Sequence, residues 1–113
     1  MSASLQCLDE PKRYVQFTNG HFDRLVLRGV LMPAGVFGVE RLVYCADVAS
    51  VEAVVATPAE SVACGMAMRA YVSAVHEGDA RGRDWIDRYD RELAERGDEV
   101  IEFFVTCRGF EIH

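Results

Sequence analysis

The sequence predicts a single α+β domain in which an antiparallel sheet carries two helices packed on one face. Short segments in the first half alternate apolar and polar residues with the two-residue period of strands. Two later segments have the 3.6-residue period of amphipathic helices, and the last residues return to a strand-like composition. With 113 residues, of which 50% are hydrophobic, the chain is long enough for one core and is typical of a globular domain.

The first half predicts a β-meander. Residues 1–12 lack a clear pattern, so we expect a flexible N-terminal arm followed by a single domain over residues 13–113. Residues 13–18 alternate and run into Asn19-Gly20, a pair that type I′ hairpin turns prefer, so residues 21–32 are expected to form the return strand. Residues 41–46 predict a third strand, whereas residues 51–56 fit either a fourth strand or a short helix.

The first predicted helix begins after Thr57. Thr57 is a capping residue, Pro58 suits the first turn, and Glu60 completes a capping box, so the helix should run to about His76 and stop before Gly78. Four small residues form a stripe along it, the alanine stripe: Ala63, Ala67, Ala70 and Ala74. Because small side chains let another backbone approach closely, the stripe favours packing against the second helix or the sheet, with a homodimer seam as the alternative.

The second predicted helix, over residues 84–97, carries the main electrostatic feature of the chain. From Glu77 to Glu102 there are ten acidic residues against five arginines, so this stretch holds most of the net charge of −6. Acids and arginines alternate at i, i+4 spacing, which predicts a water-facing helix with an excess of acid. A strand is expected at residues 99–106 and a short last strand at residues 110–112. The residues predicted to meet a basic partner are Asp84, Asp87, Asp90, Glu95, Asp98 and Glu99.

Composition argues against several classes of function. There is no basic stripe, so direct binding of nucleic acid is not expected. No apolar run approaches the roughly 20 residues that cross a bilayer, and the first residues lack the pattern of a secretion signal, so we expect a cytoplasmic protein without a membrane span. The cysteines Cys7, Cys45, Cys64 and Cys107 are widely and irregularly spaced, so we expect free thiols and no metal site or cofactor.

Glu102 would be the best catalytic candidate in the sequence if a cleft held it. It lies inside an apolar segment, where a carboxylate either points to solvent across the sheet or is held in a cleft. Residues 14–18, 27–33 and 42–45 resemble the opening of small ADP-ribosyltransferase-like domains. The resemblance implies NAD binding by Gln16 and Thr18 and a catalytic glutamate on a late strand, which would be Glu102.

The leading hypothesis for function is a small, acidic protein-binding module without catalysis. Acidic chains of this size that lack motifs include inhibitors such as immunity proteins, antitoxins and phage anti-CRISPR proteins. Such a chain would dock its acidic face on a basic surface of its partner, for instance that of a protein that handles nucleic acid. The alternatives are an ADP-ribosyltransferase-like enzyme and a structural subunit that forms a homodimer through the alanine stripe.

Overall fold

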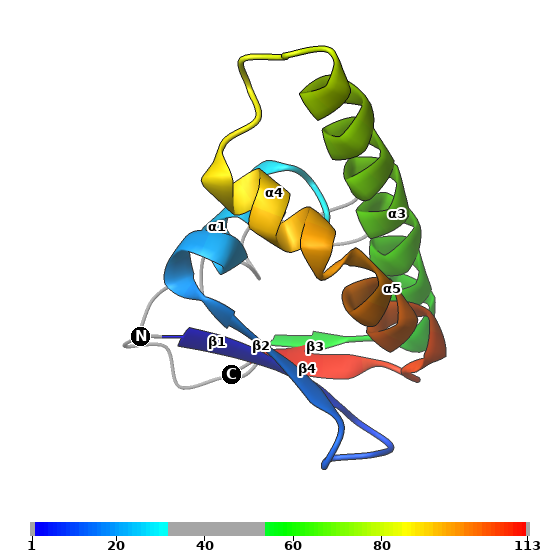
Figure 1. The fold of residues 1–113 in the computed structure, drawn as a ribbon. Coiled ribbons are helices and arrows are strands. Elements are labelled where there is room, and N and C mark those ends of the chain that lie inside the picture. The colour runs from blue at the N-terminus through cyan, green and yellow to red at the C-terminus, as the bar shows by residue number, and fades with distance from the viewer. Residues whose placement is uncertain (1, 32–53, 113) are drawn as a thin grey trace.

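The computed structural model describes residues 2–31 and 54–112, and all structural statements refer to these residues. Helices cover one face of a four-stranded antiparallel sheet with the order β2-β1-β4-β3 (Figure 1). The strands are β1 (Ser2–Cys7), β2 (Tyr14–Thr18), β3 (Val54–Ala56) and β4 (Phe110–Ile112). The helices are α1 (Asn19–Leu27), α3 (Pro58–Ala80), α4 (Arg88–Glu95) and α5 (Gly97–Thr106). The predicted α+β class is confirmed, although the described residues contain four helices rather than two.

The segment expected to be a flexible arm contains an inner strand of the sheet. β1 pairs with β2 on one side, where Leu5 faces Val15, and with β4 on the other, where Leu5 faces Ile112. Its residues alternate, with Leu5 and Cys7 buried and Gln6 half-buried. The expectation of a loose arm is therefore wrong for Ser2–Cys7, because backbone partners from both ends of the chain satisfy its hydrogen bonds.

Asn19-Gly20 begins a helix rather than a hairpin turn. Thr18 caps α1, since its side-chain oxygen accepts a hydrogen bond from His21 N at 3.3 Å. Phe22 and Leu25 then point into the core with helical spacing, so the predicted return strand is wrong for the residues of α1. The absence of a side chain at Gly20 serves packing, since a Cβ there would lie 2.9 Å from Tyr89 Cε1.

Two other predictions for the first half have different outcomes. The third strand predicted over residues 41–46 lies outside the described residues. Of the ambiguous residues 51–56, Val54–Ala56 form strand β3, which pairs with β4 at the edge of the sheet.

Helix α3 begins as predicted and ends later. Thr57 Oγ1 accepts from Glu60 N at 3.2 Å, and Glu60 Oε1 accepts from Thr57 N at 2.9 Å, so the capping box is confirmed. The helix continues through Gly78 to Ala80. Gly78 is tolerated inside the helix because it packs against Ile86, whose Cδ1 would lie 2.5 Å from a Cβ at this position.

The second half of the chain contains more helix than predicted. The helix predicted over residues 84–97 is limited to α4, with Asp87 as its N-cap. The strand predicted over residues 99–106 is wrong, because these residues belong to α5 and bury Val100, Phe103 and Phe104 at helical spacing. A short apolar run rich in Val, Ile and Phe suits a strand by propensity, but periodicity alone does not separate it from a buried helix.

The core lies between the sheet and the helices. Phe103 and Phe104 of α5 contact Phe110 of β4, with ring centroids 6.2 and 5.5 Å apart. α5 lies along α3 (Figure 1), and Gly65 allows the close approach, since a Cβ there would lie 2.6 Å from Val105 Cγ1. No helix in the described part of the chain is both long enough and apolar enough to cross a membrane. The short β4 strand predicted at residues 110–112 is confirmed.

Candidate functional site

The predicted acidic face is divided in the structure. Asp84, Glu95 and Asp98 are exposed and form no ion pair within the described residues. Glu99 is also exposed, and its Oε1 lies 2.8 Å from Arg96 Nη2. These four carboxylates are exposed on the surface, whereas Asp90 is buried and Asp87, whose side chain is 45% exposed, is paired with an arginine.

Asp90 forms the centre of a buried polar cluster between α1, α3 and α4. Its side chain is 0% exposed and accepts hydrogen bonds from Tyr71 Oη at 2.5 Å, Arg28 Nε at 3.3 Å and Arg24 Nη1 at 3.2 Å. Asp87 Oδ2 contacts Arg24 Nη2 at 2.5 Å. The expectation of an outside cation is therefore wrong for the buried Asp90, and Asp87 already has a partner, because Arg24 of α1 and Arg28, the C-cap of α1, supply the positive charge.

The electrostatics of this cluster keep Asp90 ionised. Burial alone would raise the pKa of Asp90, but hydrogen bonds from Tyr71, the Asp87 backbone and Arg28 outweigh it and hold the pKa below its ordinary value. Burial, together with the hydrogen bond to Asp90, raises the pKa of Tyr71, so the phenol stays protonated and donates. The cluster joins three helices and is explained as a structural device.

The ion pairs that form along residues 84–97 are not those expected from helical spacing, since none of four expected pairs is found within the described residues: Asp84–Arg88, Asp87–Arg91, Arg91–Glu95 and Glu92–Arg96. Arg88 contacts Glu92 at 3.2 Å, as an i, i+4 pair does, but Arg91 contacts Asp79 of α3 at 3.1 Å. The arginines that hold Asp90 come from more than sixty residues away in the sequence. No local pattern predicts such partners, and only a helical assignment of residues 19–27 would have placed Arg24 beside α4.

A groove lies next to the buried cluster and has a volume of about 430 Å³. Its lining residues are Arg28, Ala67, Ala70, Tyr71, Ala74 and Trp85. The Arg28 guanidinium lies 4.8 Å from the centroid of the Trp85 ring and donates to the Trp85 carbonyl at 3.0 Å. Among the described residues, three members of the alanine stripe thus line a groove and are not closely covered by a neighbouring element, and a homodimer through them stays a prediction.

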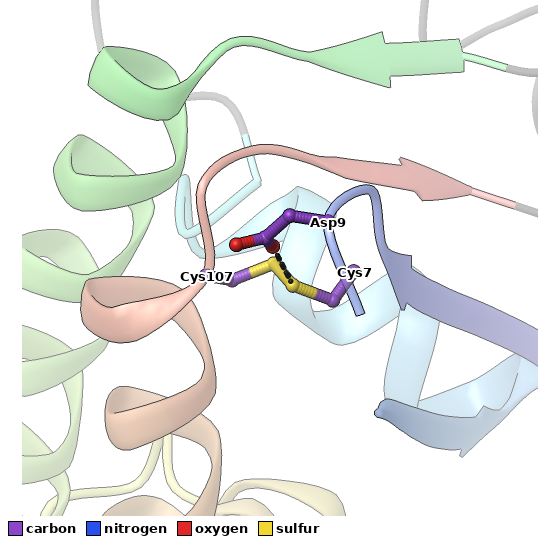
Figure 2. A group of neighbouring side chains, drawn as sticks. All are labelled: Cys7, Asp9 and Cys107. Atoms are coloured by element: carbon purple, nitrogen blue, oxygen red, sulfur yellow. Dashed lines mark hydrogen bonds between the residues drawn. A yellow bond between two sulfur atoms is a disulfide. The ribbon is translucent and has the colours of Figure 1, made fainter. Parts of the chain in front are cut away.

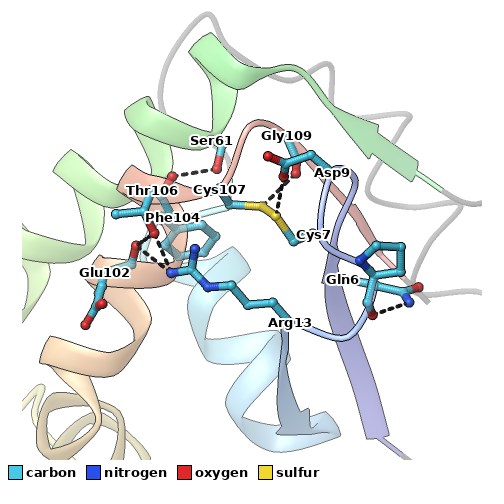
Figure 3. Close-up of a disulfide and its surroundings, with 11 residues drawn as sticks. Gln6, Cys7, Asp9, Arg13, Ser61, Glu102, Phe104, Thr106, Cys107 and Gly109 are labelled. Atoms are coloured by element: carbon cyan, nitrogen blue, oxygen red, sulfur yellow. Dashed lines mark hydrogen bonds between the residues drawn. A yellow bond between two sulfur atoms is a disulfide. The ribbon is translucent and has the colours of Figure 1, made fainter.

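The residues implied by the resemblance to ADP-ribosyltransferase-like domains do not have the arrangement it requires. Glu102 is exposed on helix α5 and not on a late strand. Its carboxylate points away from Arg13, which donates instead to the Glu102 backbone oxygen at 3.3 Å (Figure 3). Thr18 is occupied as the cap of α1, and Gln16 lies on the exposed face of β2. The prediction of a strand-borne glutamate is therefore wrong, while residues 32–33 and 42–45 of the resemblance lie outside the described residues.

Cys7 and Cys107 form a disulfide, which corrects the expectation of free thiols for these two residues (Figure 2). Cys7 ends β1 and Cys107 caps the C-terminus of α5, and their Cα atoms lie 5.7 Å apart. Cys64 is a free, buried thiol, as expected, and burial together with the charge of Glu60 raises its pKa to about 12. Cys45 lies outside the described residues.

Two oxygen atoms point at the paired sulfurs. Asp9 Oδ1 lies 2.8 Å from Cys7 Sγ, and the Gly109 carbonyl oxygen lies 2.7 Å from Cys107 Sγ (Figures 2 and 3). The sulfurs and the Asp9 carboxylate all lie within 4.8 Å of one another, so they are potential ligands of one metal ion. The irregular cysteine spacing hid this cluster, because its members come from opposite ends of the chain; the Cys7-x-Asp9 pair is its only local signal.

A comparison of the sequence with models of protein families, with curated proteins and with solved structures found no match.

Proposed function

We propose that this chain is a small, non-catalytic protein-binding module that docks an acidic surface on a basic partner. The surface is the acidic α5 face, formed by Asp98 and Glu102 of α5 together with Glu95, the last residue of α4. All three side chains are exposed, and none forms an ion pair within the described residues. The observation that carries the proposal is the i, i+4 spacing of Asp98 and Glu102, which places two uncompensated carboxylates one turn apart on α5.

The energetics of this surface favour an external cation. Like charges at i, i+4 destabilise a helix by roughly 0.2–0.5 kcal/mol. Asp98 is offset by its place in the first turn, where the helix dipole favours negative charge, but Glu102 lies beyond that turn. An arginine or lysine from a partner would remove the repulsion and would accelerate association through long-range attraction.

The class of partner follows from this charge. A basic protein surface that otherwise contacts phosphates would accept the spaced carboxylates of the acidic α5 face in their place. This is the mode of action expected of an inhibitor of the immunity, antitoxin or anti-CRISPR type, and it requires neither a cofactor nor a reaction. We place this activity in the cytoplasm as part of the same proposal.

The proposal is tested by affinity capture from the native host with paired variants. Asp98→Lys/Glu102→Lys reverses the acidic α5 face, and Glu10→Lys/Asp23→Lys makes the same change in net charge at other exposed positions. We expect one basic protein to be enriched by the unaltered chain and by the control variant and to be lost with the α5 variant. Equal enrichment by both variants would reject the acidic α5 face as the binding surface.

A further inference from the structure

We propose that Cys7, Asp9 and Cys107, when the disulfide is reduced, form a binding site for zinc or a similar thiophilic divalent cation. This inference concerns a site separate from the acidic α5 face and does not depend on a partner protein. It rests on the convergence of two sulfurs and one carboxylate from distant parts of the chain.

The three groups are close enough to share one ion once the disulfide is open and the two sulfurs have moved apart. Zinc binds thiolate sulfur at about 2.3 Å and carboxylate oxygen at about 2.0–2.2 Å, so ligand atoms around one ion lie roughly 3–4 Å from each other. The three ligand atoms here lie within 4.8 Å of one another, and β1, the following turn and the end of α5 hold them in place (Figure 2). Cys7 and Cys107 are 1% and 3% exposed, whereas Asp9 is exposed. The sulfurs would therefore close the inner side of the site and Asp9 would form its outer side, with the fourth position left to water.

Each sulfur has an acceptor oxygen beside it that the reduced thiol would use. A disulfide has no proton to donate, yet Asp9 Oδ1 and the Gly109 carbonyl oxygen lie within 2.8 Å of the two sulfurs. In the dithiol, Cys7 would donate to Asp9 and Cys107 would donate to Gly109 O. Two thiolates beside a carboxylate would repel one another. A divalent cation removes that repulsion by neutralising the charges, and disulfide formation removes it by eliminating the two thiolates.

The chemical steps balance with a dithiol as the reductant. Exchange with a small dithiol breaks the bond between the sulfurs of Cys7 and Cys107, and the dithiol becomes a disulfide while two electrons and two protons pass to the protein thiols. A divalent cation then displaces these two protons to solvent and forms two metal–sulfur bonds and one metal–oxygen bond to Asp9. In a reducing compartment the dithiol form would predominate, which would keep the site available.

The experiment uses the full chain, reduced with a dithiol, freed from it under anaerobic conditions and titrated with zinc or cobalt(II) alone. We expect one ion per chain, with sulfur-to-cobalt charge-transfer absorption, and no binding to the oxidised protein. Cys7→Ser and Asp9→Asn should each weaken binding at least about 10–100-fold, since even changes to groups behind the ligands cost that much. Cys45→Ser and Cys64→Ala should retain binding, and far-UV circular dichroism checks that each variant is folded.

The outcomes separate clearly. Unchanged affinity in Asp9→Asn would overturn the assignment of the carboxylate, and unchanged affinity in Cys7→Ser would place the metal elsewhere. Failure of the folded, reduced chain to bind zinc more tightly than the oxidised chain would also refute the site. A second Asp variant, Asp23→Asn, serves as the matched control for loss of one exposed carboxylate and should bind as the unaltered chain does.

Discussion

Replacement of Asp90 by asparagine is the sharpest test of how the helices are held together. The substitution keeps the size of the side chain but only one acceptor oxygen, so only one of two donors keeps its partner: Tyr71, which donates to Oδ1, or the Asp87 N–H, which donates to Oδ2. It removes the negative charge that compensates Arg24 and Arg28, which are only 17% and 25% exposed. Breaking a buried ion pair by removing one partner costs about 3–5 kcal/mol. Because both arginines regain some contact with water, we expect a loss of about 3 kcal/mol in the free energy of unfolding.

Asp87→Asn is the matched control. Asn caps a helix as well as Asp does, so this change removes only the ion pair with Arg24. The Asp87 side chain is 45% exposed, and a pair of this exposure contributes at most about 1 kcal/mol. The predicted difference between the two variants is therefore about 2 kcal/mol.

The assay is urea unfolding followed by far-UV circular dichroism and by the fluorescence of Trp85, the single tryptophan, which stacks on Arg28. In thermal unfolding, a loss of about 3 kcal/mol at about 4 °C per kcal/mol should lower the melting temperature of Asp90→Asn by about 12 °C. If Asp90→Asn destabilised the chain no more than Asp87→Asn, the buried cluster would not be what joins α1 to α4.

Three further predictions concern the same fold. The pKa of Asp90 in the folded chain is lowered below the ordinary value of about 3.9. The stabilisation that ionised Asp90 provides is therefore present above about pH 4 and is lost as the pH falls through the folded pKa. The free energy of unfolding should accordingly fall less steeply with acid in Asp90→Asn than in the unaltered chain. Gly65→Ala should lower the free energy of unfolding by about 1 kcal/mol in the urea assay, because the clash with Val105 outweighs the roughly 1 kcal/mol by which alanine stabilises a helix relative to glycine. A gain in stability would show that α3 and α5 do not approach so closely. Cys64, with its pKa raised to about 12, should resist alkylation at pH 8 in the folded chain and react after unfolding, and rapid labelling of the native thiol would contradict its burial.

Local signals predicted the parts of the fold that local chemistry determines. The capping box of Thr57 and Glu60 fixed the start of α3, and the α+β class followed from the periods of the apolar residues. The last strand was also found, because turn residues and Phe110 delimit it. In each case the residues that stabilise the element lie within a few positions of one another.

The parts that were missed depend on residues far apart in the sequence. Ser2–Cys7 became a strand because β4, about a hundred residues later, pairs with it. Asn19-Gly20 favours a turn, but the Thr18 cap and the burial of Phe22 determine a helix. The residues of α5 have strand propensity, and packing against α3 overrides it.

The same distinction applies to the candidate site. The excess of acid and the exposure of Asp84, Glu95, Asp98 and Glu99 were predictable from composition and helical spacing. The loss of Asp87 and Asp90 to internal arginines was not, because Arg24 and Arg28 belong to a segment that was expected to be a strand. Likewise, Asp9 meets the two cysteines only through the pairing of β1 with the end of the chain.

The salt dependence of binding to the captured partner tests most directly whether the acidic α5 face makes the contact. The dissociation constant of the purified pair should be measured by calorimetry over a range of sodium chloride concentrations, for the unaltered chain and for Asp98→Lys/Glu102→Lys. We predict that added salt weakens binding of the unaltered chain and that the variant binds more weakly with a shallower dependence, since fewer opposite charges are screened. An affinity that neither salt nor the double reversal changes would contradict the account.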